Sequence, residues 1–146
     1  MARIHVPLPA HVHYEATVPL RITDMNYGGH LGNDALLTIL HEARMQLLHH
    51  FGYSEMNLGG ASLIMADVAI EYKGEGFYGD TLHIKMAFYE LSKYGFDITY
   101  HVSNQNGKEV ARAKTGMLCF NYEARKLMSL PHEVKAKIET KAEGFL

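Results

Sequence analysis

The stretch Asp24-Met-Asn-Tyr-Gly-Gly-His-Leu-Gly-Asn33 separates two segments of different periodicity. Before it, residues 14–23 alternate between apolar and polar positions, and this period of two predicts a half-buried strand. Pro19 has no backbone donor, so this strand is expected at a sheet edge or near its own beginning. After the stretch, residues 34–50 are rich in helix formers, and Asn33 is the expected N-cap. The glycines between the two segments indicate a loop.

The predicted helix has one broad apolar face, opposite a polar face that carries Asp34, His41 and Glu42. At 100° per residue the apolar face comprises Leu36, Leu37, Leu40, Ala43, Leu47 and Leu48. Further along the chain the period returns to two, which predicts four more strands and one short helix. These elements are expected near residues 64–72, 82–88, 94–102, 109–122 and, for the helix, 132–140. One long helix beside five strands predicts an α+β fold, with the helix lying across an antiparallel sheet.

Length and composition narrow the class of protein. A chain of 146 residues fits one domain spanning residues 1–146. A formal net charge of −2 lacks the basic excess of nucleic-acid binders and of polybasic membrane-surface proteins, so neither partner is expected. The single cysteine excludes an intrachain disulfide and any cysteine-rich metal site. Because residues 1–10 lack a signal-peptide core and no apolar run approaches ~20 residues, a cytoplasmic location without a membrane span is expected.

The loop and its neighbours resemble a signature of hotdog-fold acyl thioesterases, both 4-hydroxybenzoyl-CoA thioesterase-like and acyl-carrier-protein (ACP) thioesterase-like. Many members read roughly Asp-x-Asp-x-Asn-Gly-His-Val-Asn-Asn between the first strand and the helix. In this chain Asn26 stands where many members carry a second, catalytic aspartate, and glycines replace two asparagines. Glu42-Ala-Arg44 is close to the family's Glu-x-x-Arg-like stretch, and the turn Gly79-Asp80 also matches. The resemblance implies the hotdog fold, a long central helix wrapped by a five-stranded antiparallel sheet.

The resemblance also implies hydrolysis of an acyl-CoA or acyl-ACP thioester without a metal ion or other cofactor. Water attack would be assisted by a carboxylate, with Asp24 the nearest candidate and Glu42 the second. Asn26 and His30 would orient the water or donate to the carbonyl oxygen. Backbone amides at the helix start would polarise that carbonyl as oxyanion donors. The implied substrate-binding residues are Gly29, Gly32 and Asn33, where glycine allows close approach to the backbone.

Other interpretations remain open at this point. Asp24 and Asn26 also suit simple turn capping. A hydratase or dehydratase acting on an acyl thioester would pair Asp24 with His30, and a non-catalytic acyl-CoA binding module would explain Asn26. If the protein hydrolyses a thioester, Asp24→Ala is expected to reduce kcat far more than it alters folding. A homodimer or a dimer of dimers (a homotetramer) is expected, because one side of the sheet lacks a cover and hotdog sites usually lie between subunits.

Overall fold

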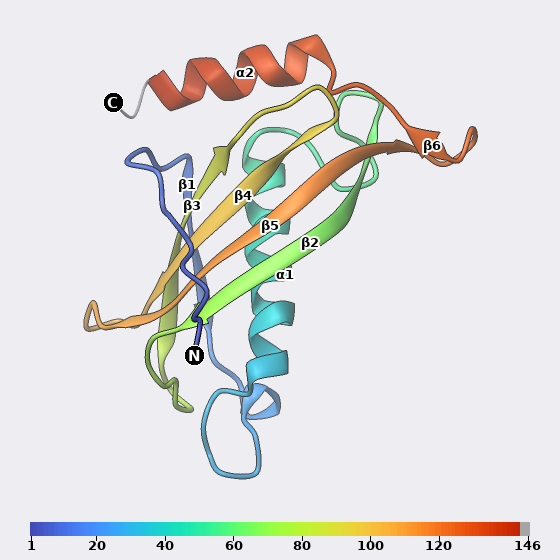
Figure 1. Ribbon diagram of the computed structural model, residues 1–146. Coiled ribbons are helices and arrows are strands. Elements are labelled where there is room, and N and C mark those ends of the chain that lie inside the picture. The colour runs from blue at the N-terminus through green and yellow to red at the C-terminus, as the bar shows by residue number, and fades with distance from the viewer. Residues whose placement is uncertain (144–146) are drawn as a thin grey trace.

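The computed structural model describes residues 1–143 and has one long helix packed against an antiparallel sheet (Figure 1). The elements follow the chain as β1 (Tyr14–Pro19), the 3₁₀ helix η1 (Ile22–Asp24), α1 (Asn33–His50), β2 (Ser62–Tyr72), β3 (Thr81–Tyr89), β4 (Gly95–Ser103), β5 (Glu109–Asn121), β6 (Lys126–Leu127) and α2 (His132–Glu143). The strand order is β1-β3-β4-β5-β2, and β6 pairs with the end of β5. The expected α+β hotdog arrangement is therefore confirmed, with β6 as a short sixth strand that the sequence did not predict.

The core lies between the apolar face of α1 and the inner face of the sheet. On the helix, Leu36, Leu40, Ala43, Leu47 and Leu48 are all 1% exposed or less. Alternate residues of the two central strands point at them: Leu82, Ile84, Met86 and Phe88 from β3, and Phe96, Ile98, Tyr100 and Val102 from β4. The predicted alternation of these strands is therefore correct. Burying side chains of this size stabilises the fold by about 1.5–3 kcal/mol each, before conformational entropy is subtracted.

The first strand and the start of the helix differ from the sequence-based expectation. β1 ends at Pro19 because proline offers no ladder donor, and the chain turns into η1, which leaves Ile22 exposed. The N-cap of α1 is Gly32 rather than Asn33, since the Gly32 carbonyl accepts from the Leu36 amide at 3.2 Å. Gly32 brings no capping side chain to the first turn. Pro19 therefore sets the end of β1, and Gly32 sets the start of α1.

β2 is an end strand with a largely exposed surface. It pairs only with β5, and the register shifts between Met65 and Asp67, so a bulge interrupts the predicted alternation. Met65, Val68 and Tyr72 are 47%, 39% and 44% exposed. On α1, Leu37 is 41% exposed and does not join the buried face as expected. These positions are exposed because no further strand within residues 1–143 lies beyond β2.

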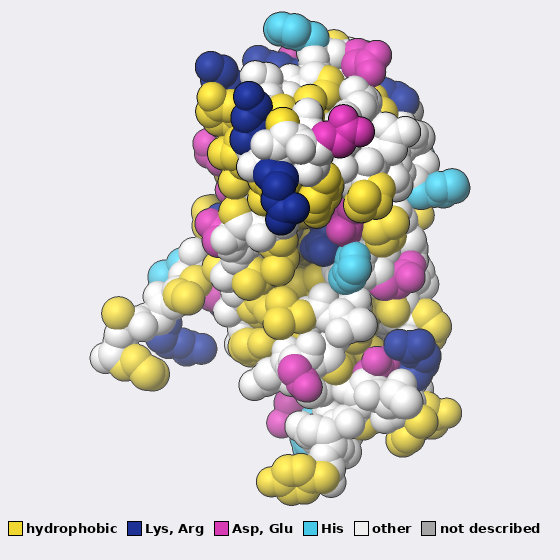
Figure 2. Space-filling view, turned by 90° about the vertical axis from the view of Figure 1, so that its right-hand side faces the viewer, with side chains coloured by type: hydrophobic (Ala, Val, Ile, Leu, Met, Phe, Trp, Pro, Cys, Tyr) yellow, Lys and Arg dark blue, Asp and Glu magenta, His cyan; other side chains and the backbone are white. Residues whose placement is uncertain are grey.

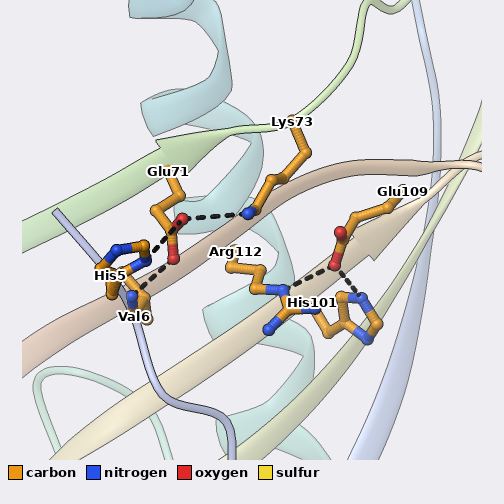
Figure 3. A network of polar contacts seen from close by, with 7 residues as sticks. All are labelled: His5, Val6, Glu71, Lys73, His101, Glu109 and Arg112. Atoms are coloured by element: carbon orange, nitrogen blue, oxygen red, sulfur yellow. Dashed lines mark hydrogen bonds and ion pairs between the residues drawn. The ribbon is translucent and has the colours of Figure 1, made fainter. Parts of the chain in front are cut away.

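Two terminal segments close the fold. α2 covers one end of the core with Val134 and Ile138, both buried, although its sequence is mostly polar. The segment before β1 crosses the sheet face opposite α1, where the Val6 amide donates to Glu71 at 2.6 Å (Figure 3). Figure 3 shows the polar groups beside this contact: His5 and Lys73 flank Glu71, and His101 and Arg112 flank Glu109. No helix in residues 1–143 is long and apolar enough to cross a membrane.

Candidate active site

The loop between η1 and α1 is a small hairpin held by its own polar groups. The Asn26 amide donates to the His30 carbonyl at 2.8 Å, and Met25 pairs with Leu31. The Asn26 Oδ1 atom accepts from the backbone amides of Gly28 (3.0 Å) and His30 (3.2 Å). Gly29 forms the turn with φ +82°, a conformation that favours glycine. Asn26 therefore fixes the loop that presents His30.

Asp24 lies buried beneath this loop, with 5% of its surface exposed. Its Oδ2 atom accepts from the Arg21 amide at 2.7 Å, and Oδ1 lies 3.5 Å from the Arg21 guanidinium. Its carbonyl accepts from the Gly32 amide at 3.0 Å, which fixes the start of α1. Asp24 lines neither of the two pockets that hold the other candidate residues. Its contacts connect η1 to the helix start.

A pocket of about 320 Å³ opens at the start of α1. It brings four of the predicted residues together: Asn26, His30, Gly32 and Asn33. β2 and the turn after it complete the wall with Tyr72, Gly74, Glu75 and Gly76, and the Tyr72 hydroxyl donates to the Asn33 carbonyl at 3.1 Å. Gly29 is not part of this wall. We call this cavity the helix-start pocket.

Unused hydrogen-bonding groups lie at the start of α1. The amides of Asn33, Asp34 and Ala35 have no acceptor within residues 1–143, as expected for a first turn without a capping side chain, and of these residues Asn33 lines the helix-start pocket. The Nδ1 atom of His30 lies 3.4 Å from Glu75 Oε2, close enough for an ion pair when the imidazole is charged, but without hydrogen-bond alignment. Among the described residues it is the one buried side-chain polar atom without a hydrogen bond. The pocket thus combines helix-start donors with a histidine beside a carboxylate.

Glu42 lies elsewhere, on the exposed side of α1. Its Oε2 atom accepts from Gln46 at 2.8 Å, and no hydrogen bond is found to Oε1 within the described chain. It lines a second pocket of about 370 Å³ with Thr17, Val18, Pro19, Arg21, Thr38, Ile39 and Gln46. Glu42 lies ten positions after Gly32, roughly 15 Å along the helix axis. Within one chain the predicted catalytic set is therefore divided between two pockets.

A buried polar network on the other flank of α1 was not predicted. Arg44, only 6% exposed, donates to Glu55 through Nε and to the Tyr100 hydroxyl through Nη1, both at 3.1 Å. The Tyr100 hydroxyl lies 2.8 Å from the Thr115 hydroxyl, and His41 lies 2.9 Å from Glu55. Burial raises the pKa of Tyr100, so its phenol stays protonated at neutral pH. Arg44 lies on the same helix face as Leu40 and Leu47, and this spacing was the signal in the sequence that the arginine would be buried.

Other histidines and the cysteine lie apart from these pockets. Within residues 1–143, no group of three or more His, Cys, Asp or Glu side chains is arranged to hold a metal ion. His13 is fully buried, and burial lowers its pKa. Cys119 is buried in β5, and burial raises the pKa of its thiol to about 11, so it is not a reactive thiolate.

Comparison with known families identifies the fold family. The profile of the Thioesterase-like superfamily matches residues 20–138. The chain belongs to this superfamily. A protein of Aquifex aeolicus (strain VF5) named "Putative esterase" is 30% identical over 95 residues, which cover 64% of this chain and 72% of that protein. The region matched by the superfamily profile includes the helix-start pocket, Glu42 and the buried network.

Solved structures of similar fold carry thioesterase names. A 1,4-dihydroxy-2-naphthoyl-CoA thioesterase from Synechocystis aligns with a TM-score of 0.78 at 22% identity, over 86% of this chain and 94% of its own. A DHNA-CoA thioesterase from Staphylococcus aureus gives 0.79 at 20% identity, over 90% and 95%. A thioesterase from Thermus thermophilus, complexed with coenzyme A and Zn, gives 0.80 at 16%, over 92% and 98%. At these identities the structures establish the shared hotdog fold.

Proposed function

We propose that this thioesterase-like protein hydrolyses an acyl-CoA or acyl-ACP thioester at the helix-start pocket. The observation that carries the proposal is that Asn33, whose amide has no acceptor, and His30 line the same pocket at the start of α1. Amides at a helix start favour negative charge, which develops on the thioester oxygen during attack. Gly32 at the N-cap has no side chain to occupy these amides. The coenzyme A complex of a similar fold supports a CoA carrier.

In the proposed reaction, a water oxygen forms a bond to the thioester carbonyl carbon while a carboxylate accepts a proton from the water. The tetrahedral intermediate then collapses, the C–S bond breaks, and the proton passes to the leaving thiolate. His30, which lies beside Glu75, would hydrogen-bond to the water or to the carbonyl oxygen, and Asn26 holds the His30 backbone in place. The products are a carboxylic acid and a free thiol.

We assign the proton-accepting role to Glu42 rather than Asp24. Asp24 is buried, and both of its carboxylate oxygens face Arg21. Glu42 is exposed and keeps one oxygen without a hydrogen bond. Because Glu42 is roughly 15 Å from the helix start of its own chain, it would act at the helix start of a second copy. The proposal therefore requires a homodimer, alone or within a tetramer.

The exposed surface supports such a dimer. Figure 2 shows a band of hydrophobic side chains down the face that lies to the right in Figure 1, where β2 and α1 are found. Leu37, Met65, Val68 and Tyr72 are exposed on these two elements. A long, apolar end strand with unpaired backbone groups favours pairing with another strand. A second copy would supply that strand.

The test is a thiol-release assay with acyl-CoAs and acyl-ACPs of graded chain length. Wild-type protein is expected to release thiol from at least one substrate, and Glu42→Gln is expected to lower kcat by about 10²–10⁴-fold. Glu123→Gln, at an exposed turn, is the matched control and should retain activity.

Two outcomes would contradict hydrolysis. Loss of enoyl absorbance without thiol release would instead indicate a hydratase, although the carboxylate beside His30 is Glu75 and not Asp24. Thermal stabilisation by acyl-CoA without any turnover would indicate a binding module.

A further inference from the structure

The Arg44 network borders a small cavity that the proposed reaction does not use. This cavity, which we call the Arg44 pocket, has a volume of about 210 Å³. Its wall consists of Leu37, Thr38, Leu40, His41 and Arg44 from α1, Met65 from β2 and Thr115 from β5. Complete small-molecule sites usually measure ~300–1,000 Å³, so this space suits one end of a ligand. The wall is apolar at Leu37, Leu40 and Met65 and polar at Thr38, His41, Arg44 and Thr115.

The Arg44 guanidinium retains a donor that no protein atom uses. Nε donates to Glu55 and Nη1 to Tyr100, whereas Nη2 has no acceptor within residues 1–143. Nη2 is not among the fully enclosed atoms that lack a hydrogen bond, so it retains contact with open space. The side chain as a whole is only 7% exposed. A buried arginine with a free donor beside a cavity favours an acceptor inside that cavity.

The hydroxyl groups beyond Arg44 add a second unused donor. Tyr100 accepts from Arg44 Nη1 and shares one hydrogen bond with Thr115. Two hydroxyl protons are present, but the Tyr100–Thr115 contact uses only one of them. No other acceptor contacts either hydroxyl in the described chain, and Thr115, 1% exposed, lines the Arg44 pocket. The part of the wall beside Arg44 and Thr115 therefore has more donors than acceptors.

Charge decides which acceptor fits. Glu55 lies 3.1 Å from Arg44 and already balances its charge. A carboxylate ligand would therefore leave a net negative charge beside the buried Arg44, whereas a neutral oxygen would not. Hydroxyl and oxo oxygens accept hydrogen bonds from both unused donors without this cost. The apolar part of the wall accommodates the hydrocarbon that carries the oxygen.

We propose that the Arg44 pocket binds the distal end of an acyl group bearing a neutral hydroxyl or oxo oxygen, with Arg44 as the specificity-determining residue. This inference rests on the proposed thioesterase function. Arginine side chains in helices point back toward the N-terminus, so the guanidinium lies near the level of Leu40, about 10 Å along α1 from Asn33. An extended chain advances roughly 1.2 Å per bond, so about eight bonds separate the thioester from the oxygen.

The experiment compares matched acyl-CoAs that differ only in a terminal hydroxyl, with acyl chains of six to twelve carbons. For wild type, kcat/KM is expected to favour the hydroxylated member by about 10-fold or more at chain lengths near eight to ten carbons. Arg44→Met is expected to abolish this preference while hydrolysis of the plain acyl-CoAs continues. Arg112→Met, on the opposite sheet face, is the matched control and should keep the preference.

A binding measurement separates this inference from the proposed function. Calorimetry with non-hydrolysable thioether analogues of the same pairs measures the hydroxyl preference without turnover. Preferential binding without hydrolysis would overturn the proposed function and support the pocket, whereas hydrolysis without preference would overturn the pocket alone. Should Arg44→Met fail to fold, Thr115→Val removes one pocket hydroxyl without changing charge and should reduce the preference. Equal kcat/KM and equal affinity for both members at every length would contradict the proposal.

Discussion

At the scale of single residues, Asp24 and Glu42 were both candidates for the proton-accepting carboxylate, and the structure places them in different environments. Asp24 has the motif position, but its carboxylate is buried and directed at Arg21. Glu42 lies on a solvated helix face, yet that exposure leaves an oxygen available to a substrate or a second copy. A general base must reach the proton it accepts, so accessibility outweighs motif position here.

The Asp24 contact leads to a stability prediction that replaces the expectation from sequence. Asp24→Ala removes the carboxylate that accepts from the Arg21 amide, and is expected to lower the free energy of unfolding by about 1–2 kcal/mol. Turnover by the folded fraction should fall by less than about 10-fold, because Asp24 does not reach the helix-start pocket. Urea unfolding and thiol release, measured on the same preparation, check both values. If turnover instead fell by about 100-fold or more while unfolding stayed unchanged, Asp24 would be restored as the base.

At the scale of secondary-structure elements, His13 connects three segments. Its Nδ1 atom accepts from the Phe88 amide of β3 at 3.1 Å, and its Nε2 atom lies 3.2 Å from the Ile138 carbonyl of α2. The neutral imidazole with hydrogen on Nε2 satisfies both contacts, whereas protonation of Nδ1 would break the first. Burial lowers the pKa of His13 from 6.5, despite the contact with Ile138.

The sign of the resulting pH dependence follows from proton linkage. Below pH 6.5 His13 becomes protonated in the unfolded chain, whereas burial opposes its protonation in the folded chain. The free energy of unfolding therefore falls as the pH is lowered. Above pH 6.5 this contribution is constant. Thermal unfolding from pH 7.5 to 5.0 should show a smaller decrease in Tm for His13→Gln than for wild type. His132→Gln, at the start of α2, should retain the wild-type decrease, and an unchanged slope in His13→Gln would contradict the assignment.

Elements whose residue pattern follows their own period could be predicted from the sequence, whereas features that depend on an element's place in the fold could not. β3, β4 and the body of α1 were correct because their apolar residues recur at the period of the element itself. β2 was less regular, since its bulge and its exposed Met65 and Val68 result from its place at the sheet end. α2 showed only two apolar anchors in a polar sequence, so its packing against the core could not be inferred from periodicity.

At the scale of the whole molecule, the separation of His30 and Glu42 becomes a prediction about assembly. If Glu42 serves the helix start of a second copy, a mixed dimer of Glu42→Gln and His30→Ala chains contains one intact site. Co-refolding equal amounts of the two inactive variants should then restore about a quarter of wild-type activity, since half of the dimers are mixed and each has one working site of two. Sedimentation on the same sample checks that dimers form.

The mixed-dimer experiment also has an outcome that contradicts the assignment. If each active site were formed within one chain, every chain in the mixture would lack one essential group, and activity would stay at the level of the separate variants. Mixing Glu42→Gln with wild type provides the control for subunit exchange. A sample that sediments as monomer while remaining fully active would also rule out the shared site.

Local patterns in the chain were sufficient to predict most of the elements, their order, the hotdog fold and the loop that carries most candidate residues. Periodicity, glycine placement and a motif supply this information, and each of them spans only neighbouring residues. The burial of Asp24, the position of Glu42 in another pocket and the cavity beside Arg44 emerged with the folded chain. Those outcomes depend on contacts between residues far apart in sequence, such as Arg44 with Tyr100, and no local pattern specifies such contacts.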